Sequence, residues 1–147
     1  MSEWNLPSLI DHTVLRPEAT KVDVLRLCRE AREHQFTVIF VPPCYVDEAV
    51  AAVAGTAIRV GIPIGFPLGG HTTAAKVAEA VEAVARGSSV LDMVINVSQL
   101  KSGDYDEVRR DIAEVVTATP NVEHKVILET CYLTQQDKLT ACRLVVE

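Results

Sequence analysis

An acidic residue lies in the middle of a stretch that has the pattern of a buried strand. Successive side chains of a strand point to opposite faces, so residues 90–97 place four apolar side chains on one face and Asp92 and Asn96 on the other. Strands of a parallel sheet are ordinarily apolar on both faces, and a buried carboxylate is unfavourable unless it is paired or used in chemistry. The pattern therefore predicts a working acid, Asp92, in the interior of the fold.

A second strand has the same pattern with a cation in it. In residues 125–129, Val126 and Leu128 share an apolar face, whereas Lys125 and Glu129 share the other. A lysine amine whose pKa is lowered by burial or by a nearby cation can attack a carbonyl and form a Schiff base. On the residues alone, Lys125 is therefore the candidate for a Schiff-base nucleophile.

These side chains must be positioned by neighbouring strands, and the sequence predicts five of them. Apolar, β-branched runs alternate with helix-spaced apolar positions, which is the pattern of β-α units in a parallel sheet. The expected strands are residues 9–15, 37–41, 58–64, 90–97 and 124–128. Three pairs have the spacing of helix N-caps: Thr20 with Asp23, Asp104 with Glu107, and Thr134 with Asp137.

Two folds fit five such units. One is an open, doubly wound sheet of the flavodoxin type, which has helices on both faces. The other is a (β/α)8 barrel of the TIM type, of which residues 1–147 would supply roughly the first five units as a single partial-barrel domain. Helices would cover Asp92 and Lys125 in the doubly wound sheet, whereas a barrel has an interior toward which they can point. The polar strand faces therefore favour the barrel.

The composition is that of an ordinary globular protein of 147 residues, with 48% hydrophobic and 23% charged residues. A net charge of -6 argues against a nucleic-acid partner, and no run has the length and apolarity of a membrane span or a signal peptide. The histidines lack metal-ligand spacing and the cysteines form no C-x-x-C pair. We therefore expect no membrane partner, no metal site and, in the cytoplasm, reduced thiols.

Five motifs resemble the deoxyribose-phosphate aldolase family, and the resemblance covers residues 9–146. One such motif would be a weak signal, but all five occur in the family's order and at its spacing. The motifs are IDHTVLRP at 10–17, PCYV at 43–46, IGFPLG at 64–69, DMVINV at 92–97 and KVILET at 125–130.

The resemblance implies a lyase that uses a lysine Schiff base and needs neither a metal nor a cofactor. Such an enzyme reversibly cleaves 2-deoxy-D-ribose 5-phosphate to acetaldehyde and D-glyceraldehyde 3-phosphate, in the cytoplasm. Asp92 matches the family's proton-relay aspartate, and Lys125 matches a lysine that lines its pocket. This gives Lys125 a supporting role in place of the nucleophilic one. Asp11 and Thr13 match polar residues at the pocket floor.

The family's Schiff-base lysine lies on the sixth strand, which would begin just past Glu147, and its phosphate loops follow strands seven and eight. The resemblance therefore implies that these 147 residues alone are inactive. Exposed strand edges invite pairing with another chain. We expect a homo-oligomer, or a complementary chain that supplies strands six to eight. The alternative is a non-catalytic half-barrel that associates with itself.

Several further expectations concern single residues. Asn96 and Glu129 are expected to orient the aspartate and the lysine. Residues 65–73 either form a phosphate-binding turn or, because both common glycine fingerprints are missing, a tight β-α turn. Gly61 and Pro63 depart from the family's smoother third strand. The remaining lysines are expected to be solvated: Lys21, Lys76, Lys101 and Lys138.

Overall fold

Five parallel strands form a single sheet in the computed structural model, which describes residues 5–147. The strands are β1 (Asp11–Thr13), β2 (Val38–Phe40), β3 (Arg59–Ile64), β4 (Val90–Val94) and β5 (Glu123–Ile127). The helices are α1 (Lys21–His34), α2 (Val46–Val53), α3 (Thr73–Ala85), α4 (Val97–Ser102), α5 (Tyr105–Ala118) and α6 (Gln135–Val146). Each strand is followed by at least one helix, so the expected alternation is confirmed.

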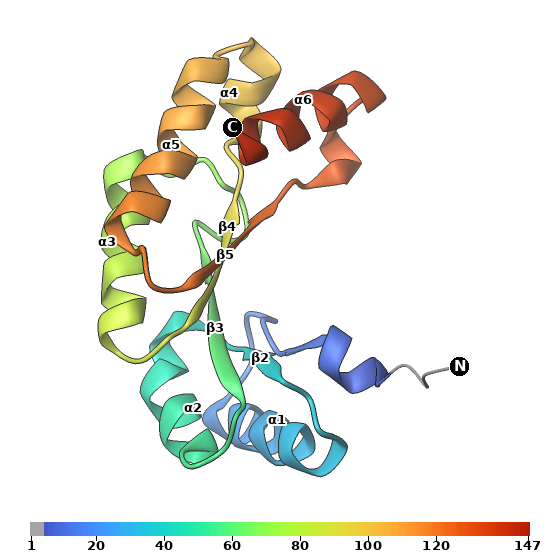
Figure 1. Cartoon of the computed structure of the whole chain (residues 1–147), viewed down its shortest axis with the longest axis vertical. Helices are drawn as coiled ribbons and strands as arrows, with labels where there is room; N and C mark the ends of the chain where they lie inside the picture. The colour runs from blue at the N-terminus through green and yellow to red at the C-terminus, as the bar shows by residue number, and fades with distance from the viewer. Residues whose placement is uncertain (1–4) are drawn as a thin grey trace.

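The order of the strands in the sheet decides between the two folds. It is β1-β2-β3-β4-β5, and every neighbouring pair is parallel. A doubly wound sheet reverses its order partway, whereas a barrel adds each new strand on the same side. Since such crossovers share one hand, the helices lie on one face of the sheet. Figure 1 shows them on the convex side of an open arc. The order is therefore that of a (β/α)8 barrel.

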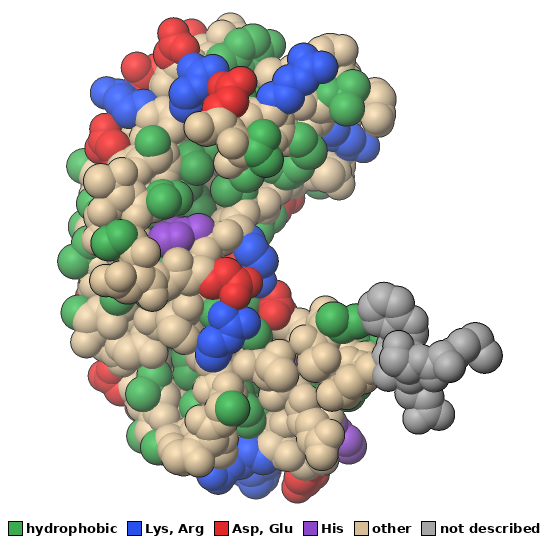
Figure 2. Space-filling view, viewed as in Figure 1, with side chains coloured by type: hydrophobic (Ala, Val, Ile, Leu, Met, Phe, Trp, Pro, Cys, Tyr) green, Lys and Arg blue, Asp and Glu red, His purple; other side chains and the backbone are tan. Residues whose placement is uncertain are grey.

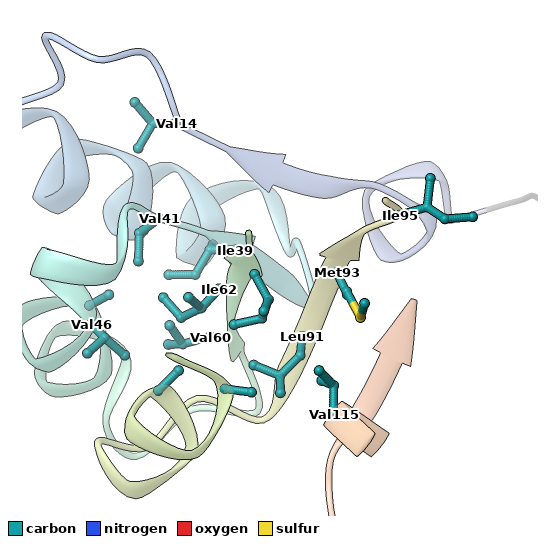
Figure 3. Packing of buried hydrophobic residues seen from close by; sticks show 14 of the residues in the cluster. Val14, Ile39, Val41, Val46, Val60, Ile62, Leu91, Met93, Ile95 and Val115 are labelled. Carbon is teal, nitrogen blue, oxygen red and sulfur yellow. The ribbon is translucent and has the colours of Figure 1, made fainter. Parts of the chain in front are cut away.

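The main hydrophobic core lies between the outer face of the sheet and the helices (Figure 3). Ile39, Ile62 and Leu91, on three neighbouring strands, are fully buried there. Leu27 of α1 and Val115 of α5 pack against the same face. Full burial of each such side chain stabilises the fold by about 1.5–3 kcal/mol. This core fixes which side chains of every strand point outward, and the alternate ones consequently point into the hollow of the arc.

A smaller apolar cluster of Val38, Phe40 and Val90 lies on the concave face. A Cβ atom at Gly61 would lie only 2.4 Å from Cζ of the Phe40 ring, so this position in β3 has room for glycine alone. Pro63, also in β3, lies beyond the last β2–β3 partner pair, Phe40 with Gly61, so β2 does not require its missing N–H. The two departures from the family pattern therefore leave β3 continuous.

The fourth strand is shorter than predicted. β4 ends at Val94, whereas the alternation suggested residue 97. The Asn96 side chain accepts a hydrogen bond from the Gln99 N–H at 3.2 Å, which begins the short helix α4 that the sequence analysis did not predict. Asp104 is the N-cap residue of α5, as predicted, but its side chain makes no cap hydrogen bond.

Two helices begin with the capping boxes that the sequence predicts. Thr20 starts α1 and Thr134 starts α6, each in a reciprocal capping box with the aspartate three residues later. A cap of this kind is typically worth about 1 kcal/mol. Among residues 5–147, none of the helices has the length and apolarity needed to cross a bilayer.

Candidate active site

Lys125 joins the acids of two distant strands inside the hollow. Its Nζ donates a hydrogen bond to Asp11 of β1 and lies 3.3 Å from Oδ1 of Asp92 in β4. Asp92 and Lys125 are partner residues in the β4–β5 register, so their side chains emerge next to each other. Asp11 lies at the other end of the sheet order. Figure 2 shows acidic and basic side chains gathered in this hollow.

The aromatic ring of Phe40 lies against the ammonium group of Lys125. Lys125 Nζ lies 4.8 Å from the centroid of the Phe40 ring, within the range of a cation–π interaction. Phe40 in turn packs over the bare backbone of Gly61. Sequence reasoning missed Phe40, although a glycine inside a strand is a signal that another group approaches the backbone closely.

The surroundings of Lys125 keep its amine protonated. Burial alone would lower the pKa of Lys125, but the hydrogen bond to Asp11 and the charge of Asp92 outweigh burial and raise that pKa above its ordinary value. An ammonium group has no free electron pair with which to attack a carbonyl. The site therefore favours an electrostatic role for Lys125 over the nucleophilic role that strand phase alone suggested.

Asp92 is the least solvated acid of the site. Its side chain is 18% exposed, against 37% for Asp11. Burial raises the pKa of the Asp92 carboxyl above its ordinary value, and the positive charge of Lys125 only partly opposes this effect. Oδ1 of Asp92 is buried, and the Lys125 ammonium group lies 3.3 Å from it without the geometry of a hydrogen bond. An acid with a raised pKa beside an ammonium group is suited to giving and taking protons.

The other predicted site residues form no hydrogen bond with the side chains of Asp11, Asp92 or Lys125 among residues 5–147. The Thr13 hydroxyl donates a hydrogen bond to the backbone oxygen of Asp11 at 2.8 Å, so its bond lies within β1. The side chain of Asn96, expected to orient the aspartate or the lysine, instead caps α4. Glu129 follows β5 with left-handed backbone angles, φ 55° and ψ 55°, which are uncommon for a residue other than glycine. Such backbone strain is often found at functional sites.

Two backbone N–H groups of the turn after β3 already have acceptors within the protein. The Gly65 N–H donates to Glu79 Oε2 at 2.7 Å, and the Gly69 N–H donates to the Gly65 carbonyl at 2.8 Å. A phosphate-binding turn needs free N–H groups that point at the ligand. The Gly65 and Gly69 N–H groups are therefore not free to bind a phosphate, which fits the tight-turn interpretation of residues 65–73.

The prediction that Lys76 is solvated is wrong. Lys76 is completely buried, and its Nζ donates to Asp111 Oδ2 at 2.5 Å and to the Val94 carbonyl at 3.0 Å. Lys21 and Lys101, by contrast, form exposed ion pairs. Val77, Val81 and Val84 form a more hydrophobic stripe on the same helix, which favours a solvated Lys76 when the sequence alone is considered. The buried face is instead the one with Lys76, Ala80 and Ala83.

Acids in the hollow are paired with cations. Asp11 and Asp92 share Lys125, and Glu123 of β5 pairs with Arg59 of β3 at 2.6 Å on the same face. Within residues 5–147, no three histidine, cysteine, aspartate or glutamate side chains gather in a way that could hold a metal ion.

Comparison with known proteins agrees with this geometry. Residues 7–142 match the family model described as DeoC/LacD family aldolase. The chain belongs to the DeoC/LacD aldolase family. It is 50% identical over 146 residues to the deoxyribose-phosphate aldolase of Thermoanaerobacter pseudethanolicus, an alignment that covers 97% of this chain. It is 47% identical to the enzyme of the same name from Brevibacillus brevis, again over 97% of this chain.

The fold of this DeoC/LacD family member also matches solved aldolases. A structure titled as the unique tetrameric structure of deoxyribose phosphate aldolase from Aeropyrum pernix superimposes with a TM-score of 0.86 at 29% identity, over 95% of this chain. The match covers 58% of the Aeropyrum chain, and the Thermoanaerobacter relative is matched over 66% of its length. This chain thus spans somewhat less than two thirds of the relatives that it resembles.

A stability measurement can separate a working acid from a structural one at Asp92. Because the folded-state pKa of Asp92 is raised, its carboxylate destabilises the fold at pH values above that pKa and has no effect below the ordinary pKa of about 3.9. We expect Asp92→Asn to raise the urea midpoint at pH 7, and the gain to vanish as the pH falls below about 4. A lower midpoint at pH 7 would instead identify a net stabilising ion pair with Lys125.

Proposed function

We propose that this chain supplies the proton-transferring part of a deoxyribose-phosphate aldolase. The observation that carries the proposal is the arrangement of Asp92 and Lys125, an acid with a raised pKa held beside a protonated lysine on the concave face of a barrel-type sheet. Membership of the DeoC/LacD family supports the choice of reaction. The substrate is 2-deoxy-D-ribose 5-phosphate, and the products are acetaldehyde and D-glyceraldehyde 3-phosphate.

In this proposal, a lysine on a unit beyond β5 forms the Schiff base with the substrate aldehyde. The C3 hydroxyl then loses its proton, the C2–C3 bond breaks to release D-glyceraldehyde 3-phosphate, and its electron pair passes into the imine to give an enamine. The enamine is protonated at C2, and water hydrolyses the resulting imine to acetaldehyde and the free lysine. Asp92 transfers the protons of the carbinolamine and enamine steps, typically worth about 10²–10⁴-fold in rate. Lys125 stabilises negative charge in the pocket as an ammonium ion. Asp11 holds Lys125 in place.

Three further β-α units are required to close the barrel and to bring the Schiff-base lysine. β1 and β5 pair on one side only among the described strands, and β5 is partly exposed along its whole length. Large apolar side chains are also exposed next to both edges: Leu6, Leu9 and Ile10 before β1, and Tyr132, Leu139 and Val146 after β5. We propose that residues 1–147 act as one partial-barrel domain in the cytoplasm and that these surfaces receive the additional units within an oligomer.

The proposal is tested by complementation. The part of the Thermoanaerobacter pseudethanolicus relative that this chain does not match is expressed as a separate polypeptide and mixed with the chain to form what we call the completed barrel. We expect cleavage of 2-deoxyribose 5-phosphate by the mixture and by neither component alone.

Borohydride reduction in the presence of acetaldehyde locates the nucleophile. Reduction converts the imine to a stable amine, and peptide mapping should find the adduct on the added polypeptide and none on Lys125. An adduct on Lys125 would contradict the electrostatic role. If the chain instead associates with itself and the completed barrel neither forms an imine nor cleaves the sugar, it is a non-catalytic half-barrel.

A further inference from the structure

A buried ion pair lies behind the sheet, directly beneath the end of the strand that carries Asp92. Lys76 of α3 is 0% exposed and Asp111 of α5 is 1% exposed. Lys76 Nζ donates to Asp111 Oδ2 at 2.5 Å. Replacing such a pair by apolar side chains of similar volume is often neutral or stabilising, because burying two charges is unfavourable. Stability alone therefore does not account for a lysine and an aspartate at these positions.

The lysine is bonded to β4 itself. Residue pairing between β3 and β4 ends with Ile64 and Met93, so Val94 is the first residue of β4 that has no partner residue on β3. Lys76 Nζ donates to the Val94 carbonyl at 3.0 Å and thereby satisfies a buried acceptor where the pairing stops. Val94 is two residues after Asp92, on the same face of the strand.

The same helix also fixes the turn that follows β3. Glu79, one turn along α3 from Lys76, accepts the Gly65 N–H at 2.7 Å. The stem of Lys76 lies so close to Gly65 that a Cβ atom there would be 2.9 Å from Lys76 Cε. Lys76 and Glu79 thus hold the carboxyl-terminal ends of β3 and β4 together, at the end of the strands where barrels of this type have their active sites.

We propose that Lys76, held by Asp111, is a positioning residue that fixes the end of β4 and, through it, the carboxyl group of Asp92. The proposal rests on the assignment of Asp92 as the proton-transferring acid. Misplacement of a reacting group by about 1 Å can reduce a rate by up to about 10²-fold. A rigid anchor on the backbone two residues from the acid is a direct means of preventing such misplacement.

The test uses a double variant, because Lys76→Met alone would leave the Asp111 charge buried without its partner. Lys76→Met combined with Asp111→Leu removes both charges and keeps apolar volume, so the fold should persist. The hydrogen bond to the Val94 carbonyl is lost. The matched control is Lys21→Met, which removes a lysine from an exposed pair with Glu48.

The first measurement is amide hydrogen exchange on the chain itself. The Ile95 N–H, which donates to the Ile127 carbonyl at 3.0 Å, should exchange at least about tenfold faster in the double variant, while amides of α1 remain as protected as before. The control should change neither. Exchange at Ile95 within about twofold of the wild type, or an equal rise in α1, would overturn the proposal.

The second measurement is turnover of the completed barrel. The double variant should lower kcat by about 10–10²-fold with KM nearly unchanged, and it should shift the acidic limb of the pH profile. A normal kcat and profile in an assembled barrel would overturn the positioning role. If the wild-type completed barrel does not cleave the sugar, the proposed function has failed, and the exchange experiment still decides whether Lys76 anchors β4.

Discussion

Asp92→Asn is expected to lower the turnover of the completed barrel by about 10²–10⁴-fold, the usual contribution of a positioned general acid or base. The amide is nearly isosteric with the carboxyl group and keeps its hydrogen-bonding reach, but it cannot take up and release a proton. The measurement is the rate of acetaldehyde release from 2-deoxyribose 5-phosphate at saturating substrate. Since the acid acts after binding, we expect the loss in kcat to be much larger than any change in KM.

The matched control for this variant is Glu123→Gln. Glu123 is a second carboxylate on the concave face of β5, but it pairs with Arg59 at 2.6 Å. Both variants replace a carboxylate by an amide inside the hollow, so their effects on assembly should be similar. Only Asp92→Asn should abolish most of the turnover. Near-normal activity of Asp92→Asn in an assembled barrel would mean that this acid is structural.

Strand alternation was sufficient to predict both the type of fold and the placement of Asp92 and Lys125 on one face of the sheet. Asp92 and Lys125 each interrupt an otherwise apolar strand, and both lie on the concave face as predicted. This inference is robust because the period of a strand is two, so an error of one or two residues at a boundary does not change the assignment of an interior residue. The boundaries were less predictable, since Asn96 ends β4 by capping a helix.

The buried face of a helix was harder to predict from the sequence than the buried face of a strand. On α3 the buried positions are Lys76, Ala80 and Ala83, which are less hydrophobic than the valines of the neighbouring stripe. A buried lysine depends on its partner, and Asp111 is supplied by another helix, 35 residues along the chain. The position of Asp111 among Val108, Ile112 and Val115 is the one local signal that an acid faces the core.

The protonation state of Lys125 could not be inferred from its strand alone. A buried amine next to a cation would be a nucleophile, whereas the same amine next to two carboxylates is an ammonium ion. The second carboxylate, Asp11, is 114 residues away in the sequence. Only the curvature of the sheet brings it within reach, so the choice between the two roles required the structure.

Gly69→Ala is expected to destabilise the chain by about 2–5 kcal/mol. Gly69 has φ 67°, a left-handed conformation that is unfavourable by about 1–2 kcal/mol for a residue with a side chain. An alanine Cβ would also lie 2.2 Å from the backbone oxygen of Ile95, just past the end of β4. Because a backbone oxygen cannot rotate away, the overlap should add about 1–3 kcal/mol. Urea unfolding of the purified variant at pH 7 measures the sum.

Gly103→Ala separates the two contributions. Gly103 ends α4 with φ 80°, so it has the same unfavourable handedness, but an added Cβ would meet no atom within 4 Å. We expect this variant to lose only about 1–2 kcal/mol, the conformational part alone. The difference between the two variants then measures how tightly the turn after β3 is packed against the end of β4. Equal losses would show that the turn yields to the added methyl group and that its contact with Ile95 is not a rigid support for the site.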